Sequence, residues 1–329
     1  MPSNINMQGK GLKELVRTAF SKKIAGVLSA LIAITIFSSI LSPHFLTSYN
    51  ITIIIRELAF IGIVTLGQTM VLLTGEIDLS VGAVAGFCSV MAGKLMVELN
   101  VSPLLSIILA LILGSLCGLV NGLLVTKLKL NALVVTLGTM GVYSGLNLVI
   151  TKGKSITDIP AHIYFLGQGM LLEIPFPLYI MLAILIVLTF TAYNTTYGRH
   201  LYATGSNIEA AEIVGLRVDA IKIGAFIISS LLATIAGILM IARLGSAQPA
   251  IGQAWLLPSI AAAVIGGTAL TGGEGMPLGS ILGAAIIGVI ENTIILLGVS
   301  PYWQTVVSGT VVVAAVSIDS MRRMIAGKK

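Results

Sequence analysis

Residues 103–126 read PLLSIILALILGSLCGLVNGLLVT, and no Asp, Glu, Lys or Arg interrupts this run. A helix needs about 20 apolar residues to cross the hydrocarbon core of a bilayer, so the run predicts a transmembrane helix. Small residues recur at every fourth position, at Ala110, Gly114, Gly118 and Gly122. Because small residues at this spacing let two helices approach closely, we expect tight packing inside a bundle, either static or permitting the helices to slide.

The apolar character of this run extends over the whole chain. Of its 329 residues 56% are hydrophobic and 10% charged, and the mean hydropathy is +1.03. A soluble domain carries about 25% charged residues, which it needs to cover its surface. The runs are continuous rather than alternating, which favours helices over a β-barrel. The sequence therefore predicts an all-α polytopic membrane protein of about ten transmembrane helices. The expected spans are 24–41, 58–74, 79–97, 103–126, 132–150, 175–193, 223–242, 254–271, 277–297 and 301–318.

The basic residues predict how these spans are oriented. Short cytoplasmic loops of membrane proteins collect Lys and Arg. Ten spans with both termini in the cytoplasm place 14 of the 19 Lys and Arg residues on the inner side. A nine-span chain would instead carry the basic end of the sequence across the membrane. The pI near 9.3 is thus an orientation signal, and nucleic acid is not an expected partner.

The predicted organisation is a single membrane domain with short cytoplasmic ends. Residues 1–23 form a basic N-terminal segment containing a short amphipathic helix, 24–318 form the transmembrane domain, and 319–329 form a basic tail. The apolar run after residue 23 also resembles a secretory signal, but no Ala-x-Ala cleavage site follows it. The longest connections, 151–174 outside and 194–222 inside, are too short to be separate domains.

Polar residues within the expected spans are the candidates for a solute pathway. Glu291, with Asn292 beside it, is the clearest ionisable group in an apolar run, which makes it a functional candidate. The side chains either line a route for a polyhydroxylated solute or hydrogen-bond neighbouring helices, and the sequence leaves both open. The pathway candidates are Asn121, Asn131, Thr136, Asn147, Glu291 and Asn292.

Motifs for chemistry are missing from the sequence. Lys154 and Ser155 match the last two residues of the phosphate-binding loop motif, but the first glycine of that motif would fall on Leu148. Cys88 and Cys117 both lie in apolar runs, which predicts buried thiols rather than a disulfide or a metal site. We therefore expect no enzyme activity, no metal and no cofactor bound by this chain.

The long inner connection contains a short helix with clear end signals. Residues 198–216 read GRHLYATGSNIEAAEIVGL. Ser206 or Asn207 can cap a helix, Glu209 suits its first turn, and Gly215 ends it. A helix of about two turns is not stable alone, so it is expected to dock on a partner; a solvated connector is the alternative. The residues expected on its docking face are Ile208, Ala211, Glu212 and Gly215.

Together with this connection, three further blocks make the sequence resemble a known family. They are 75–82 (GEIDLSVG), 130–139 (LNALVVTLGT) and 266–275 (GGTALTGGEG). The four blocks in this order resemble the inner-membrane permease subunits of ATP-binding-cassette importers, in the branch for ribose, arabinose, xylose, galactose and related monosaccharides. One departure is Glu76, which stands where the family pattern has a second glycine.

The resemblance implies a division of labour among subunits. A second copy of the permease would form a homodimer, an ATPase subunit using ATP and Mg²⁺ would bind at the cytoplasmic face, and an extracytoplasmic solute-binding protein would deliver the solute. Asp78 and Ser80 would cap the next span and hold its junction in shape. The residues implied for the coupling helix to the ATPase are Asn207, Glu209, Ala210, Ala211 and Gly215.

Other functions remain open at the level of sequence. Relatives of this fold class carry nucleosides, autoinducer-like furanosyl compounds or branched-chain amino acids. An ATP-independent channel or ion-coupled carrier is a different class, as is a sensory protein whose inner loop recruits a signalling partner. A route with few fixed charges favours a neutral polyol, so the main prediction is a monosaccharide permease.

Overall fold

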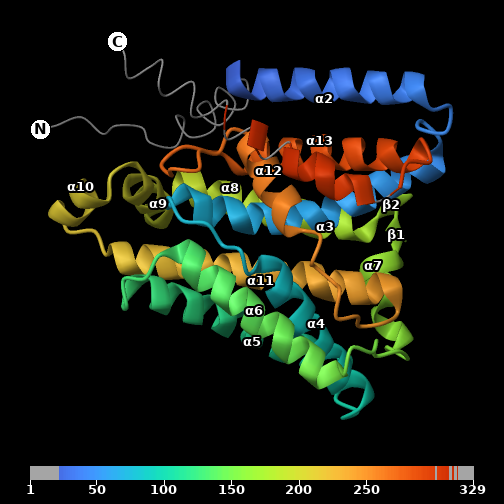
Figure 1. Ribbon diagram of the computed structural model, residues 1–329, viewed down its shortest axis with the longest axis horizontal. Coiled ribbons are helices and arrows are strands. Elements are labelled where there is room, and N and C mark those ends of the chain that lie inside the picture. The colour runs from blue at the N-terminus through green and yellow to red at the C-terminus, as the bar shows by residue number, and fades with distance from the viewer. Residues whose placement is uncertain (1–21, 301, 311–312, 315–316, 318–329) are drawn as a thin grey trace, which may run out of the picture.

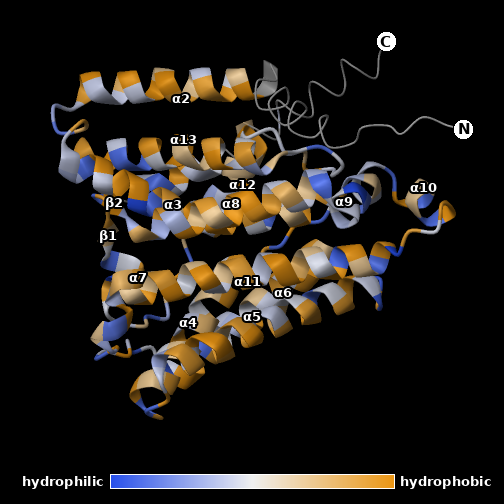
Figure 2. Ribbon diagram, turned by 180° about the vertical axis from the view of Figure 1, so that it is seen from behind, coloured by the Kyte–Doolittle hydropathy of each residue, from blue (hydrophilic) through white to orange (hydrophobic). Residues whose placement is uncertain are grey.

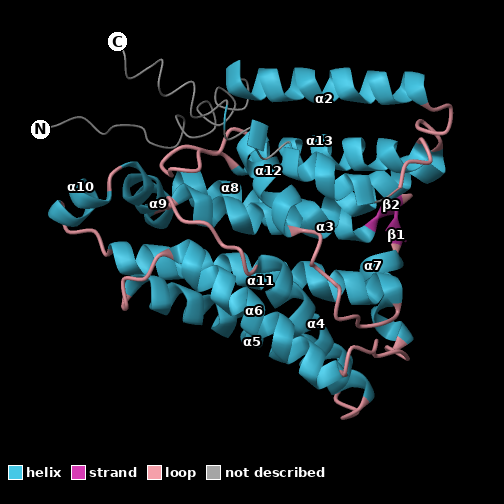
Figure 3. Cartoon of the chain, in the orientation of Figure 1, coloured by secondary structure: helices cyan, strands magenta, loops and turns pink. Residues whose placement is uncertain are grey.

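The computed structural model describes residues 22–300, 302–310, 313–314 and 317, and helices make up most of this part of the chain (Figure 3). The main helices fall where the apolar runs predict them. They are α2 (Lys22–Leu41), α3 (Ser48–Leu73), α4 (Val81–Val97), α5 (Pro103–Thr126), α6 (Ala132–Thr151), α8 (Phe176–Asn194), α11 (Val218–Leu244), α12 (Leu256–Ile265) and α13 (Pro277–Leu296).

Seven of these helices are long and apolar enough to cross a membrane, and α4 and α12 are shorter apolar helices. The all-α polytopic prediction is therefore confirmed. Within the expected run 301–318, residues 302–310 are helical and much of the remainder lies outside the described residues. The count of ten spans and the side of the termini stay predictions. The N-terminal amphipathic helix and the basic tail 319–329 also lie outside the described residues.

The long helices lie side by side, and most of the connecting segments lie at the two ends of the bundle (Figure 1). One end, named here the α10 end, carries α9 (Thr196–Ser206) and α10 (Ile208–Ile213). The other, the hairpin end, carries η1 (Ala161–Ile163), α7 (Tyr164–Gln168) and the antiparallel pair β1 (Met170–Leu171) and β2 (Ile174–Pro175). The helices are mostly apolar, and polar residues concentrate toward the ends (Figure 2).

Two helix boundaries differ from the sequence prediction by six residues or more. Helix α3 begins at Ser48, ten residues before the expected start, because Thr47 caps it by accepting a hydrogen bond from the backbone N–H of Asn50. Helix α12 ends at Ile265, six residues before the expected 271. The chain leaves the helix through Gly267, whose φ of +92° is a left-handed conformation that a helix cannot contain.

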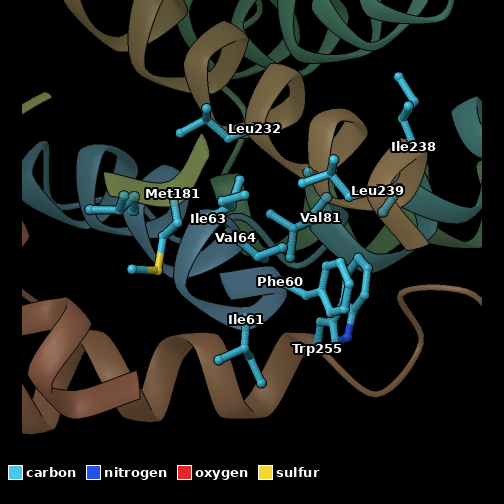
Figure 4. Close-up of a cluster of buried hydrophobic side chains, with 14 of the residues drawn as sticks. Phe60, Ile61, Ile63, Val64, Val81, Met181, Leu232, Ile238, Leu239 and Trp255 are labelled. Atoms are coloured by element: carbon cyan, nitrogen blue, oxygen red, sulfur yellow. The ribbon is translucent and has the colours of Figure 1, made fainter. Parts of the chain in front are cut away.

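The core centres on α11, which packs against α3, α4 and α5. Figure 4 shows Ile63 and Val64 of α3 facing Leu232 and Leu239 of α11. These four side chains are buried. Burying an aliphatic side chain of this size stabilises a fold by about 1.5–3 kcal/mol in water, whereas close packing is the main contribution within lipid.

The small-residue pattern of 103–126 marks a close helix contact. A Cβ added to Gly118 would lie 2.4 Å from the carbonyl oxygen of Phe226 in α11, and one added to Gly114 would lie 2.0 Å from Oγ1 of Thr234. The prediction of close packing at these glycines is confirmed. Gly141 of α6 has the same kind of spacing, but nothing described lies within 4 Å of its added Cβ.

Candidate functional site

A cavity of about 510 Å³ lies between α3, α12, α13 and the helical segment 302–310. Its walls come from the first part of α3 and the last part of α13, which lie toward the hairpin end (Figure 1). The lining residues are Ile53, Ile54, Glu57, Ile61, Gln253, Ala254, Trp255, Leu256, Leu257, Pro258, Gly288, Glu291, Asn292, Ile295, Gln304, Thr305 and Ser308. Apolar walls with a few converging polar groups are typical of a site for a small molecule.

Two carboxyl groups are the ionisable groups of this lining. Glu57 extends from α3 and Glu291 from α13. Oε1 of Glu291 accepts a hydrogen bond of 3.2 Å from Oγ of Ser308, which fixes the side chain against the segment 302–310. Carboxylates accept hydrogen bonds from hydroxyl groups, and amides both accept and donate them, while an indole such as Trp255 offers an apolar face. The lining can therefore bind a small polyhydroxylated molecule.

One ion pair and several hydrogen bonds connect the lining residue Glu57 to neighbouring helices. Arg243 of α11 forms an ion pair with Glu57, and its guanidinium carbon lies 5.4 Å from the centre of the Phe60 ring. Gln168 donates to the carbonyl of Arg243 over 2.9 Å and accepts at its own carbonyl from Arg56 over 3.3 Å. These contacts join α3, α7 and α11 at the hairpin end.

Asn292 both lines the cavity and bonds two helices. Its amide nitrogen donates to Oδ1 of Asn50 over 2.8 Å, and the amide of Asn50 donates back over 3.0 Å. The next residue, Thr293, donates to Oγ of Ser38 in α2 over 2.7 Å. Both Glu291 and Asn292 thus line the cavity and bond another segment, Glu291 to Ser308 and Asn292 to Asn50. A role on a solute route for either residue stays a prediction.

The other four pathway candidates lie away from the cavity. The amide of Asn121 donates to Ser80, and that of Asn147 to the carbonyl of Pro249. Thr136 donates to the carbonyl of Ala132 within its own helix. Asn131 is exposed and caps α6 by accepting from the N–H of Leu133. The structure gives these four side chains helix-bonding or capping contacts, and a pathway role for them stays a prediction.

Asp78 organises a buried network at the start of α4. Oδ1 of Asp78 accepts from the backbone N–H of Ser80 over 2.9 Å and from its hydroxyl over 2.6 Å, and Oδ2 accepts from Ser229 of α11 over 3.0 Å. Asn121 of α5 then donates to Ser80 over 2.8 Å. Ser80 is the N-cap residue of α4, but its side chain makes no cap hydrogen bond and donates to Asp78 instead. The junction is held by three helices together.

The short helix of the inner connection is present as α10. Oδ1 of Asn207 accepts from the N–H of Ala210 over 2.9 Å, and Gly215 follows the helix with a φ of +83°. Of the expected docking face, Ile208, Glu212 and Gly215 are exposed, whereas Ala211 is only 3% exposed and is covered by this chain itself. Docking on a partner stays a prediction. The exposed apolar tip of the helix is formed by Ile213 (85% exposed) and Val214 (73% exposed).

Sequence reasoning missed most of the cavity lining. Gln253 and Trp255 precede α12 and show no local pattern that singles them out. Ile54, Glu57 and Ile61 fall on one face of a helix at three- and four-residue spacing, which is a usable signal once α3 is known to begin at Ser48. The remaining residues meet only through the packing of distant segments.

Comparisons with known proteins identify relatives over nearly the whole chain. Residues 50–316 match the family described as branched-chain amino acid transport system / permease component. The chain is 41% identical to a ribose import permease protein of Bacillus subtilis (strain 168), over 89% of this chain and 92% of the relative. It is 35% identical to a fructose import permease protein of Rhizobium meliloti, over 88% and 83%. It is 34% identical to an autoinducer 2 import system permease protein of Photorhabdus luminescens, over 90% of each chain. No solved structure matches the chain.

Proposed function

Because the chain belongs to the family of permease components of branched-chain amino acid transport systems, we propose that it is the membrane permease subunit of a binding-protein-dependent ATP-binding-cassette importer for a monosaccharide. The observation that carries this proposal is the identity of 41% with a ribose import permease over about nine-tenths of both chains. The cavity agrees with it, since amides, hydroxyls and two carboxylates beside Trp255 suit a neutral polyol better than an aliphatic amino acid.

The proposal assigns the two ends of the bundle to the two sides of a bacterial cytoplasmic (inner) membrane. The α10 end faces the cytoplasm, where a separate ATPase subunit binds and hydrolyses ATP with Mg²⁺. The hairpin end faces outward, where a solute-binding protein delivers the sugar to the cavity. A second copy of the permease completes the transporter. This chain itself binds no nucleotide and acts as the conduit.

Transport by the assembled complex tests the proposal. Proteoliposomes holding the permease, its ATPase and the binding protein are given ATP and radiolabelled ribose, with fructose, a nucleoside and leucine as rival solutes. We expect ATP-dependent accumulation of a monosaccharide and little uptake of leucine. Uptake by the permease alone, with no ATPase present, would contradict the importer and favour a channel or ion-coupled carrier.

The apolar tip of α10 is expected to contact the ATPase. Replacing Ile213 by Asp places a charge on a side chain that is 85% exposed, so the fold of the permease should be unaffected. If Ile213 is buried in the interface, association with the ATPase weakens about tenfold or more. Glu209→Arg is expected to act in the same direction, because it reverses a charge on the same helix. Co-purification of the ATPase with tagged permease measures both.

A matched control lies at the opposite end of the bundle. Leu172 between the hairpin strands is 84% exposed, so Leu172→Asp makes the same chemical change at the same exposure. This variant should retain the ATPase. Equal loss from Ile213→Asp and Leu172→Asp, or from neither, would contradict the role of α10.

Replacing the carboxyl group of Glu291 by an amide is expected to impair sugar uptake. The change Glu291→Gln keeps the size of the side chain, so the cavity stays open, but hydrogen bonds from sugar hydroxyls to a neutral amide are weaker than those to a carboxylate. Uptake at limiting sugar should fall about tenfold, corresponding to about 1.4 kcal/mol. The exposed Glu98→Gln, outside the cavity, is the control. Normal uptake by Glu291→Gln would remove the cavity from the route.

A further inference from the structure

The two segments that flank α10 both contact the same stretch of chain. This stretch, residues 73–80, joins the end of α3 to the start of α4 and is called here the connector. In Figure 1 it leaves α3 beside α9 and passes to α4 on the other side of α11. Helix α9 precedes α10 in the chain and α11 follows it. The connector therefore contacts the helix before and the helix after α10, which is proposed to bind the ATPase.

On the α9 side the contact is between backbones. A Cβ added to Gly205 would lie 1.9 Å from the carbonyl oxygen of Leu73 and 2.4 Å from the backbone nitrogen of Gly273. That nitrogen donates to the same carbonyl of Leu73 over 3.0 Å. Since no side chain fits at 205, α9 cannot move toward the connector without pushing it.

Tyr202, one turn before Gly205, bonds α9 to the loop that contains Gly273, between α12 and α13. The hydroxyl of Tyr202 donates to the carbonyl of Gly275 over 2.8 Å. Burial raises the pKa of Tyr202, so the phenol remains protonated and keeps this hydrogen bond. The end of α9, the end of α3 and the loop before α13 therefore form one junction.

On the α11 side the contact is an ion pair. Nζ of Lys222 lies 2.5 Å from Oε1 of Glu76 in the connector, and the two side chains are only 12% and 19% exposed. Removing one partner of such a pair leaves the other charge partly buried and uncompensated, which is strongly unfavourable. Lys222 stands one turn into α11, which is the helix that follows α10 in the chain. Glu76 is the residue that departs from the glycine of the family pattern.

The connector in turn reaches the helices of the bundle. Asp78 accepts from Ser229 of α11, and Ser80 accepts from Asn121 of α5. Leu73 is the last residue of α3, the helix whose other half carries Glu57 of the cavity. A displacement of the connector is therefore passed to a helix that lines the candidate solute site.

We propose that the connector 73–80 transmits the movement of α10 to the cavity, with the Gly205 contact and the Glu76–Lys222 ion pair as its two points of attachment. This inference rests on the proposed function, because it assumes an ATPase bound at α10. Glu76, Lys222 and Gly205 are positioning residues: they touch neither solute nor nucleotide. When these residues are substituted, the ATPase still binds the permease and hydrolyses ATP, but its movement no longer reaches the helices that line the cavity.

The test compares ATPase binding with the number of sugar molecules taken up per ATP hydrolysed. In proteoliposomes of the full complex, Glu76→Gln and Lys222→Gln should keep the ATPase bound, while uptake per ATP falls about tenfold, within the usual range of coupling between sites. The charge-swapped double variant, Glu76→Lys with Lys222→Glu, should restore at least half of the wild-type ratio. If a single variant fails to insert, the double variant decides, since it retains opposite charges at both positions.

Matched controls separate attachment from general damage. Asp219→Asn breaks the exposed ion pair with Lys127 in the first turn of α11, where the side chains are 47% and 60% exposed. Gly141→Ala adds a methyl group where nothing described lies within 4 Å, whereas Gly205→Ala forces the α9 contact apart. Both controls should couple normally, and Gly205→Ala should not.

Three outcomes overturn the inference. The first is an unchanged uptake per ATP in both Glu76→Gln and Gly205→Ala, while the wild-type complex couples normally. The second is a fall of uptake per ATP in Asp219→Asn that equals the fall in Glu76→Gln. The third is a wild-type complex that binds no ATPase, which would also overturn the proposed function; the first two leave that function standing.

Discussion

Replacing Gly118 by valine should force α5 away from α11 and destabilise the protein by about 3 kcal/mol, the upper range for overpacking. A Cβ at this position would lie 2.4 Å from the carbonyl oxygen of Phe226 and 2.8 Å from Cα of Ile227. Both atoms belong to the backbone of α11, so no rotation of a side chain can relieve the clash. The thermal unfolding temperature of the detergent-purified protein should fall by roughly 10 °C.

The matched control is Gly141→Val in α6. Both positions exchange a helical glycine for the same β-branched residue, so the effect on helix propensity is equal. Nothing described lies within 4 Å of an added Cβ at Gly141, so the change should stay within about 0.5 kcal/mol. A similar loss in both variants would show that helix propensity, rather than the approach of α5 to α11, sets the cost.

This pair of glycines also shows how far a sequence pattern reaches. The spacing along 103–126 correctly predicts a closely packed helix, because a stripe of small residues has little other effect than to shorten the distance to a neighbour. The similar spacing of Gly141 and Gly145 faces no described atom. A local pattern specifies that a helix can pack closely, but the partner is chosen by the arrangement of the whole bundle.

Helix positions were predictable from hydropathy because lipid requires every spanning backbone to satisfy its own hydrogen bonds. The two misplaced boundaries have physical causes. Arg56 and Glu57 make the start of α3 look polar, yet Glu57 is compensated by Arg243 from α11. Beyond Ile265 the chain stays apolar while Gly267 adopts a left-handed conformation, which hydropathy does not register.

The candidate site was predictable only in part. Helix α10 follows from local signals, since the cap at Asn207 and the stop at Gly215 act within a few residues. Glu291 was identifiable because an ionisable group is rare in an apolar run. Its hydrogen-bond donor Ser308 and its neighbour Trp255 in the cavity come from other segments, so only the packed structure brings them together.

Removing the carboxyl group of Asp78 should cause the largest loss of stability, about 3–5 kcal/mol, because each buried donor left without its acceptor costs about 1–3 kcal/mol. Asp78→Ala deprives three donors of their acceptor at once: the N–H and hydroxyl of Ser80 and the hydroxyl of Ser229. Asp78 is fully buried, so water cannot replace the lost bonds without entering the core. We expect a lower unfolding temperature in detergent and less protein in the membrane fraction.

The amide variant separates shape from hydrogen bonding. In Asp78→Asn the remaining oxygen can still accept from Ser80, and the new amide can donate to Oγ of Ser229, so the loss should be less than half of that caused by alanine. Asp219→Ala removes a carboxylate that is 47% exposed and paired with Lys127, and it should cost no more than about 1 kcal/mol. Equal stability of Asp78→Ala and Asp219→Ala would show that the Asp78 network does not hold α4, α5 and α11 together. Equal losses of stability in Asp78→Ala and Asp78→Asn would show that the effect comes from the charge rather than from the hydrogen bonds.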